Sequence, residues 1–324
     1  MTIHHPNALI PIAAAALPAG LLALDIERAA GFAQAEKADA TKRAYGSDFA
    51  LFRGWCAGRG VGALPASPES VAAFLACEAE KGIRPSTIGR RCAAIKYAHK
   101  LAGHAVPTDD ERVKATVRGI RRTFGTAARK KTPATAEHII PMALGTGAGL
   151  KGTRDRALLL LGFAGAFRRS EFVALDCSDI EETESGLRVT IRRGKTDQEG
   201  EGAVIAIVRG SIACPVAALA AWRHAAGITT GPLFRSIRKG GKVGARLSAQ
   251  SVADIVKAHA ENVGLDPALF AGHSLRAGFL TSAAKRGASI FKMMDQSRHK
   301  SVDTLRGYVR DAEIFKDHAG AGLL

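Results

Sequence analysis

Six polar side chains in the second half of the chain have the types needed to stabilise a negatively charged transition state. They comprise two arginines, two histidines, a lysine and a tyrosine: Arg168, Lys195, His273, Arg276, His299 and Tyr308. Arginine suits phosphate oxygens because its planar guanidinium donates two parallel hydrogen bonds and keeps its charge. Phosphoryl transfer depends mainly on charge neutralisation and positioning. The set therefore indicates chemistry at a phosphate group.

Short spacings group several of these residues. Arg168-Arg-Ser-Glu171 opens a predicted helix, and residues three apart share a helix face, so Glu171 is placed to hold the Arg168 side chain. His273 and Arg276 are also three apart at a predicted helix start, and both project toward one anion. Alone, each motif fits a plainer interpretation, such as a surface ion pair, a capping histidine or, for Lys195, a solvated hairpin lysine. Only the combination is specific.

The order Arg, Lys, His-x-x-Arg, His, Tyr resembles the tyrosine recombinase or phage-integrase family, which includes Xer-type and Cre-type enzymes. The family's R-x-S-E box sets the register on Arg168 rather than Arg169. The 23 residues from Arg276 to His299, and the nine from His299 to Tyr308, agree with family spacing. The resemblance extends over residues 38–316, with specific motifs only in the second half.

The resemblance implies two rounds of transesterification at DNA phosphates. Tyr308 would attack the scissile phosphate, forming a 3′-phosphotyrosyl link and freeing a 5′-hydroxyl. Arg168 and Arg276 would hold the non-bridging oxygens, and Lys195 would protonate the leaving oxygen. The bond energy stays in the phosphotyrosine, so we expect no cofactor. The sequence has neither a Walker motif nor clustered acidic metal ligands, which agrees with that expectation.

The same resemblance assigns supporting roles and exposes a departure from the family. His273 would take or relay the tyrosine proton, His299 would hydrogen-bond the phosphate, and Glu171 would support the first arginine. Family members often carry Leu-Gly before the second histidine, where this chain has Ser297-Arg298. This difference removes no catalytic group but leaves the subfamily open.

Composition points to a polyanionic partner. The 324 residues carry 46 Lys plus Arg against 30 Asp plus Glu, a formal charge of +16. From Arg84 to Lys131 there are 13 basic and 3 acidic residues, so the excess is concentrated. Such a stretch favours contact with the DNA backbone over a merely solvated face. The residues expected to bind phosphates are Arg84, Arg90, Arg91, Lys96, Arg118, Arg121, Arg122, Arg129, Lys130 and Lys131.

Hydrophobic periodicity predicts a mainly α fold with a small antiparallel β-sheet. Four short helices between residues 38 and 125 predict a helical core-binding domain, preceded by a flexible lead-in over 1–37. A basic linker over 126–134 leads to an integrase-type α+β catalytic domain over 135–324. In that domain, alternating apolar residues predict a hairpin whose glycine-rich tip carries Lys195.

The cysteines and the apolar N-terminal segment bear on the cellular location of the protein. The five cysteines include no CxxC pair, which argues against a disulfide framework or zinc site and favours a reducing cytosol. The apolar segment Ala8–Leu24 is interrupted by prolines and is shorter than the ~20 residues of a spanning helix. We therefore expect a cytoplasmic protein, associated with the nucleoid when bound to DNA, and no membrane partner.

Three alternatives remain beside a site-specific recombinase. A type IB topoisomerase shares the chemistry but relaxes DNA without exchanging partners. A non-catalytic DNA-binding regulator would need no nucleophile, and a basic membrane-surface protein rests on the apolar N-terminus alone. The resemblance implies a homo-tetramer on two DNA sites. The tail after Val309 offers apolar residues for a neighbour, or folds back on its own domain: Ile314, Phe315, Leu323 and Leu324.

Overall fold

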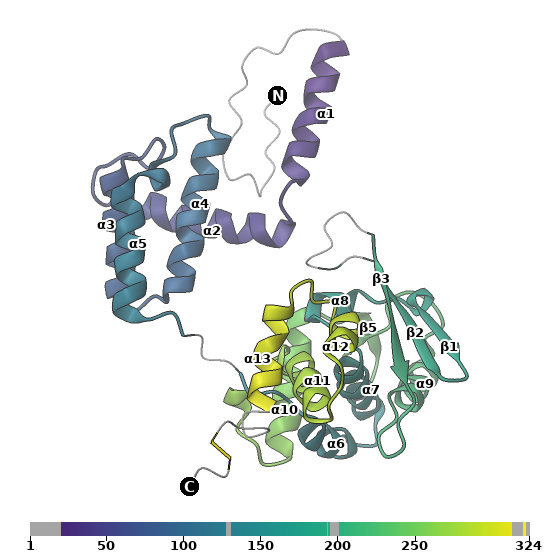
Figure 1. Cartoon of the computed structure of the whole chain (residues 1–324). Coiled ribbons are helices and arrows are strands. Elements are labelled where there is room, and N and C mark those ends of the chain that lie inside the picture. Colours follow the sequence, from purple (N-terminus) through teal and green to yellow (C-terminus); the bar gives the residue numbers. More distant parts are fainter. Residues whose placement is uncertain (1–20, 128–130, 193, 195–200, 313–319, 322–324) are drawn as a thin grey trace. The chain divides into compact units, whose positions relative to one another are not determined.

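Two separate hydrophobic cores divide the chain into units Met1–Arg129 and Lys130–Leu324. The computed structural model describes residues 21–127, 131–192, 194, 201–312 and 320–321 (Figure 1). Helices dominate both units and the strands all lie in the second, so the predicted fold class, mainly α with a small antiparallel sheet, is confirmed.

The first unit contains the four helices expected between residues 38 and 124. They are α2 (Asp39–Ala57), α3 (Pro68–Glu80), α4 (Pro85–Leu101) and α5 (Glu111–Phe124). The side chain of Ser67 accepts a hydrogen bond from the Ser70 N–H, and Pro68 occupies the first turn, so the start of α3 follows from local sequence. A short 3-10 turn, η1 (Pro107–Asp109), precedes α5, and the side chain of Asp110 between them accepts a hydrogen bond from the Arg112 N–H.

One further helix corrects the prediction for the N-terminal lead-in. Residues Leu21–Ala35 form the helix α1 within the segment predicted to be a flexible lead-in. Alanine and leucine favour the helix regardless of packing, and α1 keeps large apolar side chains exposed, including Phe32 at 80%. All α1 side chains whose burial the structure describes are exposed, so they form no apolar stripe that would predict the helix. In the described part of the chain, no helix is both long and apolar enough to cross a bilayer.

The core of the second unit forms around a buried helix. α7 (Leu150–Ala164) contributes Leu158, Leu159 and Leu161, which are all fully buried. The helices around it are α6 (Ala136–Leu144), α9 (Pro215–Ala226), α10 (Ala249–Asn262) and α11 (Ser274–Lys285). Trp222 anchors α9, and its indole Nε1 donates to the Leu233 carbonyl at 2.9 Å.

The predicted hairpin is present with one extra strand. β1 (Ile180–Thr183), β2 (Gly186–Ile191) and β3 (Ala203–Val208) form an antiparallel sheet in that order. Leu187, Val189 and Ile191 face the core, as their alternation predicts. A second, two-stranded sheet joins β4 (Arg235–Ile237) to β5 (Val243–Arg246). Lys195, on the hairpin tip, lies outside the described residues.

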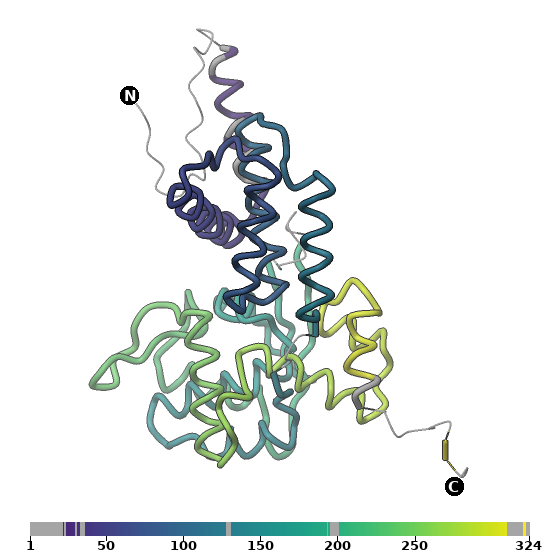
Figure 2. The backbone as a smooth tube through the Cα atoms, turned by 90° about the vertical axis from the view of Figure 1, so that its left-hand side faces the viewer, coloured from purple at the N-terminus to yellow at the C-terminus, as the bar shows by residue number. Residues whose placement is uncertain are grey.

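Short helices complete the second unit where the chemistry is expected. α8 (Arg169–Ala174) follows α7, and α12 (Ile290–Ser297) and α13 (Val302–Ala312) pack on α11. Leu280, Met293 and Leu305 form a small core there. In Figure 2 this C-terminal part, in yellow, lies at one side of the second unit. Two 3-10 turns, η2 (Cys177–Asp179) and η3 (Pro267–Leu269), complete the elements of this unit.

Candidate active site

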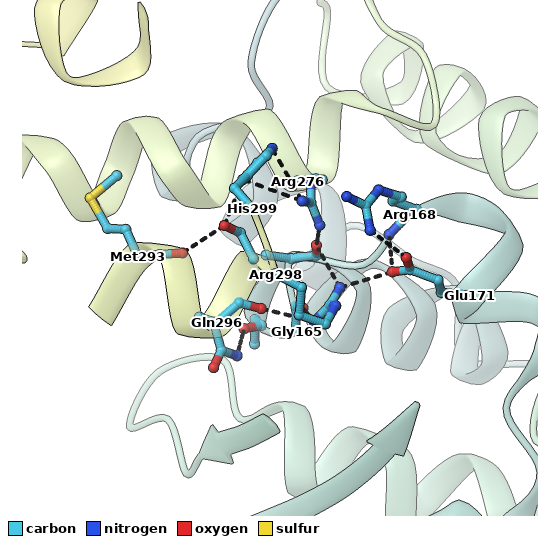
Figure 3. A network of polar contacts seen from close by, with 11 residues as sticks. Gly165, Arg168, Glu171, Arg276, Met293, Gln296, Arg298 and His299 are labelled. Carbon is cyan, nitrogen blue, oxygen red and sulfur yellow. Dashed lines mark hydrogen bonds and ion pairs between the residues drawn. The ribbon is translucent and has the colours of Figure 1, made fainter. Parts of the chain in front are cut away.

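Arg168 stands at the start of α8, in the turn that follows α7. Glu171 is 3% exposed, and its Oε1 accepts from Arg168 Nη1 at 2.6 Å. Its Oε2 also accepts from the Arg168 backbone N–H at 3.1 Å. The carboxylate therefore caps the helix and orients the guanidinium at the same time (Figure 3).

Arg276 lies on α11 and is fully buried. Its Nη1 donates to the carbonyl of Ala166, in the turn before Arg168, at 2.6 Å. Its Nη2 lies 3.2 Å from His299 Nε2 and 3.3 Å from His299 Nδ1. A single guanidinium thus joins the turn after α7 to the histidine that follows α12.

The tautomer of His299 follows from its neighbour Ser297. The Ser297 hydroxyl donates its only proton to the Met293 carbonyl at 2.6 Å and lies 2.7 Å from His299 Nδ1. Nδ1 must therefore carry the proton of that second hydrogen bond, which leaves Nε2 as the acceptor beside Arg276. Burial, followed by the charges of Arg276 and Arg168, lowers the pKa of His299 to about 4, so the ring is neutral at pH 7.

A third guanidinium, that of Arg298, completes the network and was not among the predicted site residues. Its Nη2 donates to Glu171 Oε2 at 2.9 Å, and its Nη1 donates to the Gln296 carbonyl at 2.8 Å. The guanidinium also lies 5.5 Å from the centre of the Phe167 ring. The only sequence signal was the departure from the family's Leu-Gly, which did not reveal that Arg298 contacts Glu171.

The resulting network holds three guanidiniums against one carboxylate. The side chains of Arg168, Arg276 and Arg298 are 17%, 0% and 11% exposed. Burial, then the charges of Arg168 and Arg298, lowers the pKa of Arg276 to about 9. Burial acts to raise the pKa of Glu171, but the hydrogen bond from Arg168 and the charge of Arg298 hold it below its usual value. Because desolvated cations are costly without a counter-charge, the arrangement suits an anion with several oxygens.

Two other predicted residues are linked to this network through charge. His273 is exposed at the start of α11, and its charge contributes to the lowered pKa of His299. Tyr308 is half-buried on α13 against the small core of Leu280, Met293 and Leu305. Its charge acts to raise the pKa of Arg276, against the larger effect of burial. Among the described residues, no cluster of three or more His, Cys, Asp or Glu could hold a metal ion.

The basic residues of the first unit divide into paired and exposed sets, and Arg91 requires a correction. Arg91 was expected to bind phosphate, but it is 8% exposed and pairs with Glu78 and, at 3.7 Å, with Asp48. Arg91 belongs to the buried side of α4 together with Ile88, Ile95 and Ala98, so it faces the core. Arg90 makes two hydrogen bonds to Asp48, of 2.7 and 3.1 Å.

The remaining basic residues also differ in their surroundings. Lys96 pairs with Asp109, and Arg118 pairs with Glu111. Lys131 Nζ donates to the Ala268 carbonyl at 2.5 Å. Arg129 and Lys130 lie outside the described residues. Three arginines are exposed and form no ion pair with any residue that the structure describes: Arg84, Arg121 and Arg122.

Comparisons with known proteins identify relatives that match most of this chain. Residues 135–313 match the model of the phage integrase family. An integrase/recombinase XerD homologue of Selenomonas ruminantium is 42% identical over 290 residues, covering 87% of this chain and 85% of the relative. The Cre recombinase of Escherichia phage P1 is 23% identical over 279 residues, 80% of each chain.

A solved structure supports the fold over most of the chain. A lambda integrase dimer bound to a COC′ core site matches with a TM-score of 0.61 at 16% identity, covering 93% of this chain and 80% of that chain. The fold is that of this integrase, and the site concentrates three guanidinium groups around one carboxylate. With the family match and the 42% identical relative, the conclusion is specific: this chain belongs to the phage integrase family.

Proposed function

We propose that this chain is a site-specific tyrosine recombinase, which cuts and rejoins duplex DNA through a 3′-phosphotyrosyl intermediate. The observation that carries the proposal is the buried excess of positive charge around Arg276, where Arg168 and Arg298 share the single carboxylate of Glu171. A phosphodiester approaching its transition state supplies the missing negative charge.

The proposed reaction needs no cofactor, because each bond that breaks is replaced by a bond of the same type. The Tyr308 oxygen forms a bond to the scissile phosphorus while the bond to the 5′-oxygen breaks. Arg168 and Arg276 bind the non-bridging oxygens, and Lys195 gives its proton to the 5′-oxygen. Attack by the 5′-hydroxyl of another strand reverses these steps and frees the tyrosine.

The histidines have different roles in this proposal. The exposed His273 accepts or relays the Tyr308 proton, because the phenol has a pKa near ~10 and needs a base at neutral pH. Neutral His299 presents a lone pair at Nε2 and must gain a proton there to donate to the phosphate. An anion bound beside it favours that protonation. Glu171 supports the reaction by orienting Arg168.

Duplex DNA is the proposed partner of both a core-binding domain over residues 38–125 and a catalytic domain over 135–324, which a linker over 126–134 connects. The exposed arginines Arg84, Arg121 and Arg122 support backbone contact by the first domain. Strand exchange breaks four strands and each protomer supplies one tyrosine, so we also propose a homo-tetramer on two sites. Its place in the cell would be the cytoplasm, at the nucleoid when DNA is bound.

A strand-transfer assay tests the proposal. The DNA site is first captured as covalent protein–DNA complexes from a library of random-sequence duplexes, and two copies of the captured site are then marked differently and mixed. Recombinant products carrying both marks are expected. Relaxation of supercoiled DNA without such products would favour a type IB topoisomerase, and binding without covalent capture would favour a non-catalytic regulator.

A further inference from the structure

We propose that Arg298 is a positioning residue that fixes Arg168 and His299 relative to one another, so that both engage the same phosphate. The inference rests on the proposed function, since it concerns the same site. Arg298 immediately precedes His299 in the chain, and its side chain reaches the element that carries Arg168. It thereby connects two segments that are 127 residues apart in sequence.

The first part of the argument is the set of contacts that Arg298 makes. Its Nη2 donates to Glu171 Oε2 at 2.9 Å, while the other oxygen of Glu171 accepts from Arg168 at 2.6 Å. A carboxylate held on both sides has little freedom to rotate. Arg298 therefore restricts Arg168 through Glu171 without needing to touch the substrate.

Arg298 also holds the backbone turn that leads into Arg168. Its two terminal nitrogens lie 3.4 Å from the Gly165 carbonyl and 3.3 Å from the Ala166 carbonyl. The preceding carbonyl, that of Ala164, accepts from the Gln296 amide at 2.8 Å. Figure 3 shows Gln296 and Arg298 beside Gly165 in this turn.

The backbone supplies independent support. Among the described residues, only Ala166 and Arg298 combine a positive φ with a side chain, at 46° and 57°. Glycine adopts this left-handed conformation readily, whereas other residues adopt it at a cost. The two residues contact each other, because Arg298 Nη2 lies 3.3 Å from the Ala166 carbonyl. Arg298 is the C-cap of α12, a position where glycine costs less. We infer that its side chain offsets this cost through a role beyond ending the helix.

The substitution Arg298→Gly separates positioning from simple stabilisation. Glycine relieves the backbone and ends α12 in its preferred conformation, so the variant is expected to fold. If Arg298 only helped the fold, this change would leave cleavage intact. If Arg298 positions Arg168, cleavage falls although the cap improves. Arg298→Lys keeps the charge but loses the planar fork, so it should fall between wild type and the glycine variant.

Single-turnover cleavage of a nicked suicide duplex bearing the captured site measures the effect. The Arg298→Gly variant should cleave ~10- to 100-fold more slowly, because small misplacements at a reacting centre cost that much. Duplex affinity should stay within about twofold, since the guanidinium is buried. Added guanidinium ion should restore part of the rate in the glycine variant only. Arg188→Ala, an exposed arginine on β2, is the matched control and should cleave at the wild-type rate.

Two results would overturn the inference: a glycine variant that cleaves as fast as wild type, or one whose loss lies entirely in duplex affinity. Failure of the proposed function looks different, because wild type itself would then capture no DNA. In that case calorimetric titration with orthovanadate decides. Binding ~10-fold weaker in Arg298→Gly, with partial recovery in Arg298→Lys, would support positioning of the oxyanion site, whereas equal binding, or no binding by wild type, would refute it.

Discussion

Arg91 in the first unit and Arg276 in the second are both arginines withdrawn from water, but the charges around them differ. Arg91 lies between the buried carboxylates of Asp48 and Glu78, which Arg90 and Lys81 approach from the surface. Arg276 lies beside two further guanidiniums and a single carboxylate. Among the buried groups of the first cluster, two carboxylates surround one arginine, whereas in the second cluster three guanidinium groups surround one carboxylate.

This difference separates structural arginines from binding arginines better than burial does. A buried ion pair that is internally balanced has nothing left to offer a ligand. A buried cationic excess is costly in the free protein and is relieved when an anion arrives, so it marks a site. Arg154 follows the first pattern, since Asp155 accepts from it at 2.6 and 2.8 Å and also contacts His259.

The largest expected effect on stability comes from the balanced cluster. Arg91→Met leaves Asp48 and Glu78 without their buried partner and should lower the free energy of unfolding by about 3–5 kcal/mol. Arg276→Met removes one of three guanidinium groups that share a single carboxylate, so it should lower the free energy of unfolding far less. Urea unfolding of the two variants measures the contrast. Equal losses would remove the distinction between the clusters.

In a cleavage assay the substitutions at the active site should have the larger effect, and Arg91→Met the smaller one. Arg276→Met and Arg168→Ala each leave transition-state charge uncompensated, so single-turnover cleavage should slow by ~100- to 1,000-fold, about 3–4 kcal/mol. Arg91→Met, assayed at a temperature where it is folded, should cleave bound DNA at nearly the wild-type rate. Normal cleavage by either catalytic-site variant would contradict the charge argument.

The pH dependence of stability offers an intermediate effect. His299 titrates near 6.5 when unfolded and near 4 when folded, so the unfolded state binds the proton first as the pH falls. His299 should therefore cost the wild type stability between about pH 6.5 and 4, relative to His299→Asn. Thermal unfolding of both proteins across this range checks the sign. A wild type that gained stability there, compared with the variant, would mean that the folded ring is charged.

The smallest effects should come from the exposed arginines of the first unit. Arg84→Ala, Arg121→Ala and Arg122→Ala should each weaken duplex binding and reduce the slope of log affinity against log salt by about one. Arg90→Ala should instead lower the melting temperature, because it leaves one side of Asp48 uncovered. Fluorescence anisotropy at several salt concentrations compares them, and unchanged slopes for all three exposed arginines would exclude contact between these residues and the DNA backbone.

Local patterns were sufficient for much of the architecture. Helix caps, apolar stripes and strand alternation located most helices and the β2–β3 hairpin, because those signals lie within a few residues of the elements they specify. Spacing within the helix did not reveal that Arg91 is buried, because its partners Asp48 and Glu78 belong to other helices. The strands of the second sheet have only three and four residues, which is too short for a clear alternation.

The site shows the same limit of local reasoning. The spacing of Arg168 and Glu171 predicted their proximity because both belong to one helix turn. Arg298 and Gln296 reach that turn from more than 120 residues away, and no local spacing contains such contacts. The tautomer of His299 depended on where the Ser297 hydroxyl donates, which only the folded backbone decides.

Mass-spectrometric location of the covalent DNA adduct tests the central claim most directly. A nicked suicide duplex bearing the captured site should leave DNA attached to Tyr308 in the wild type. Tyr308→Phe removes one oxygen and little volume, so it should fold and bind DNA but form no adduct. DNA attached to Tyr45, Tyr97 or a serine, or an adduct that persists in Tyr308→Phe, would contradict the account.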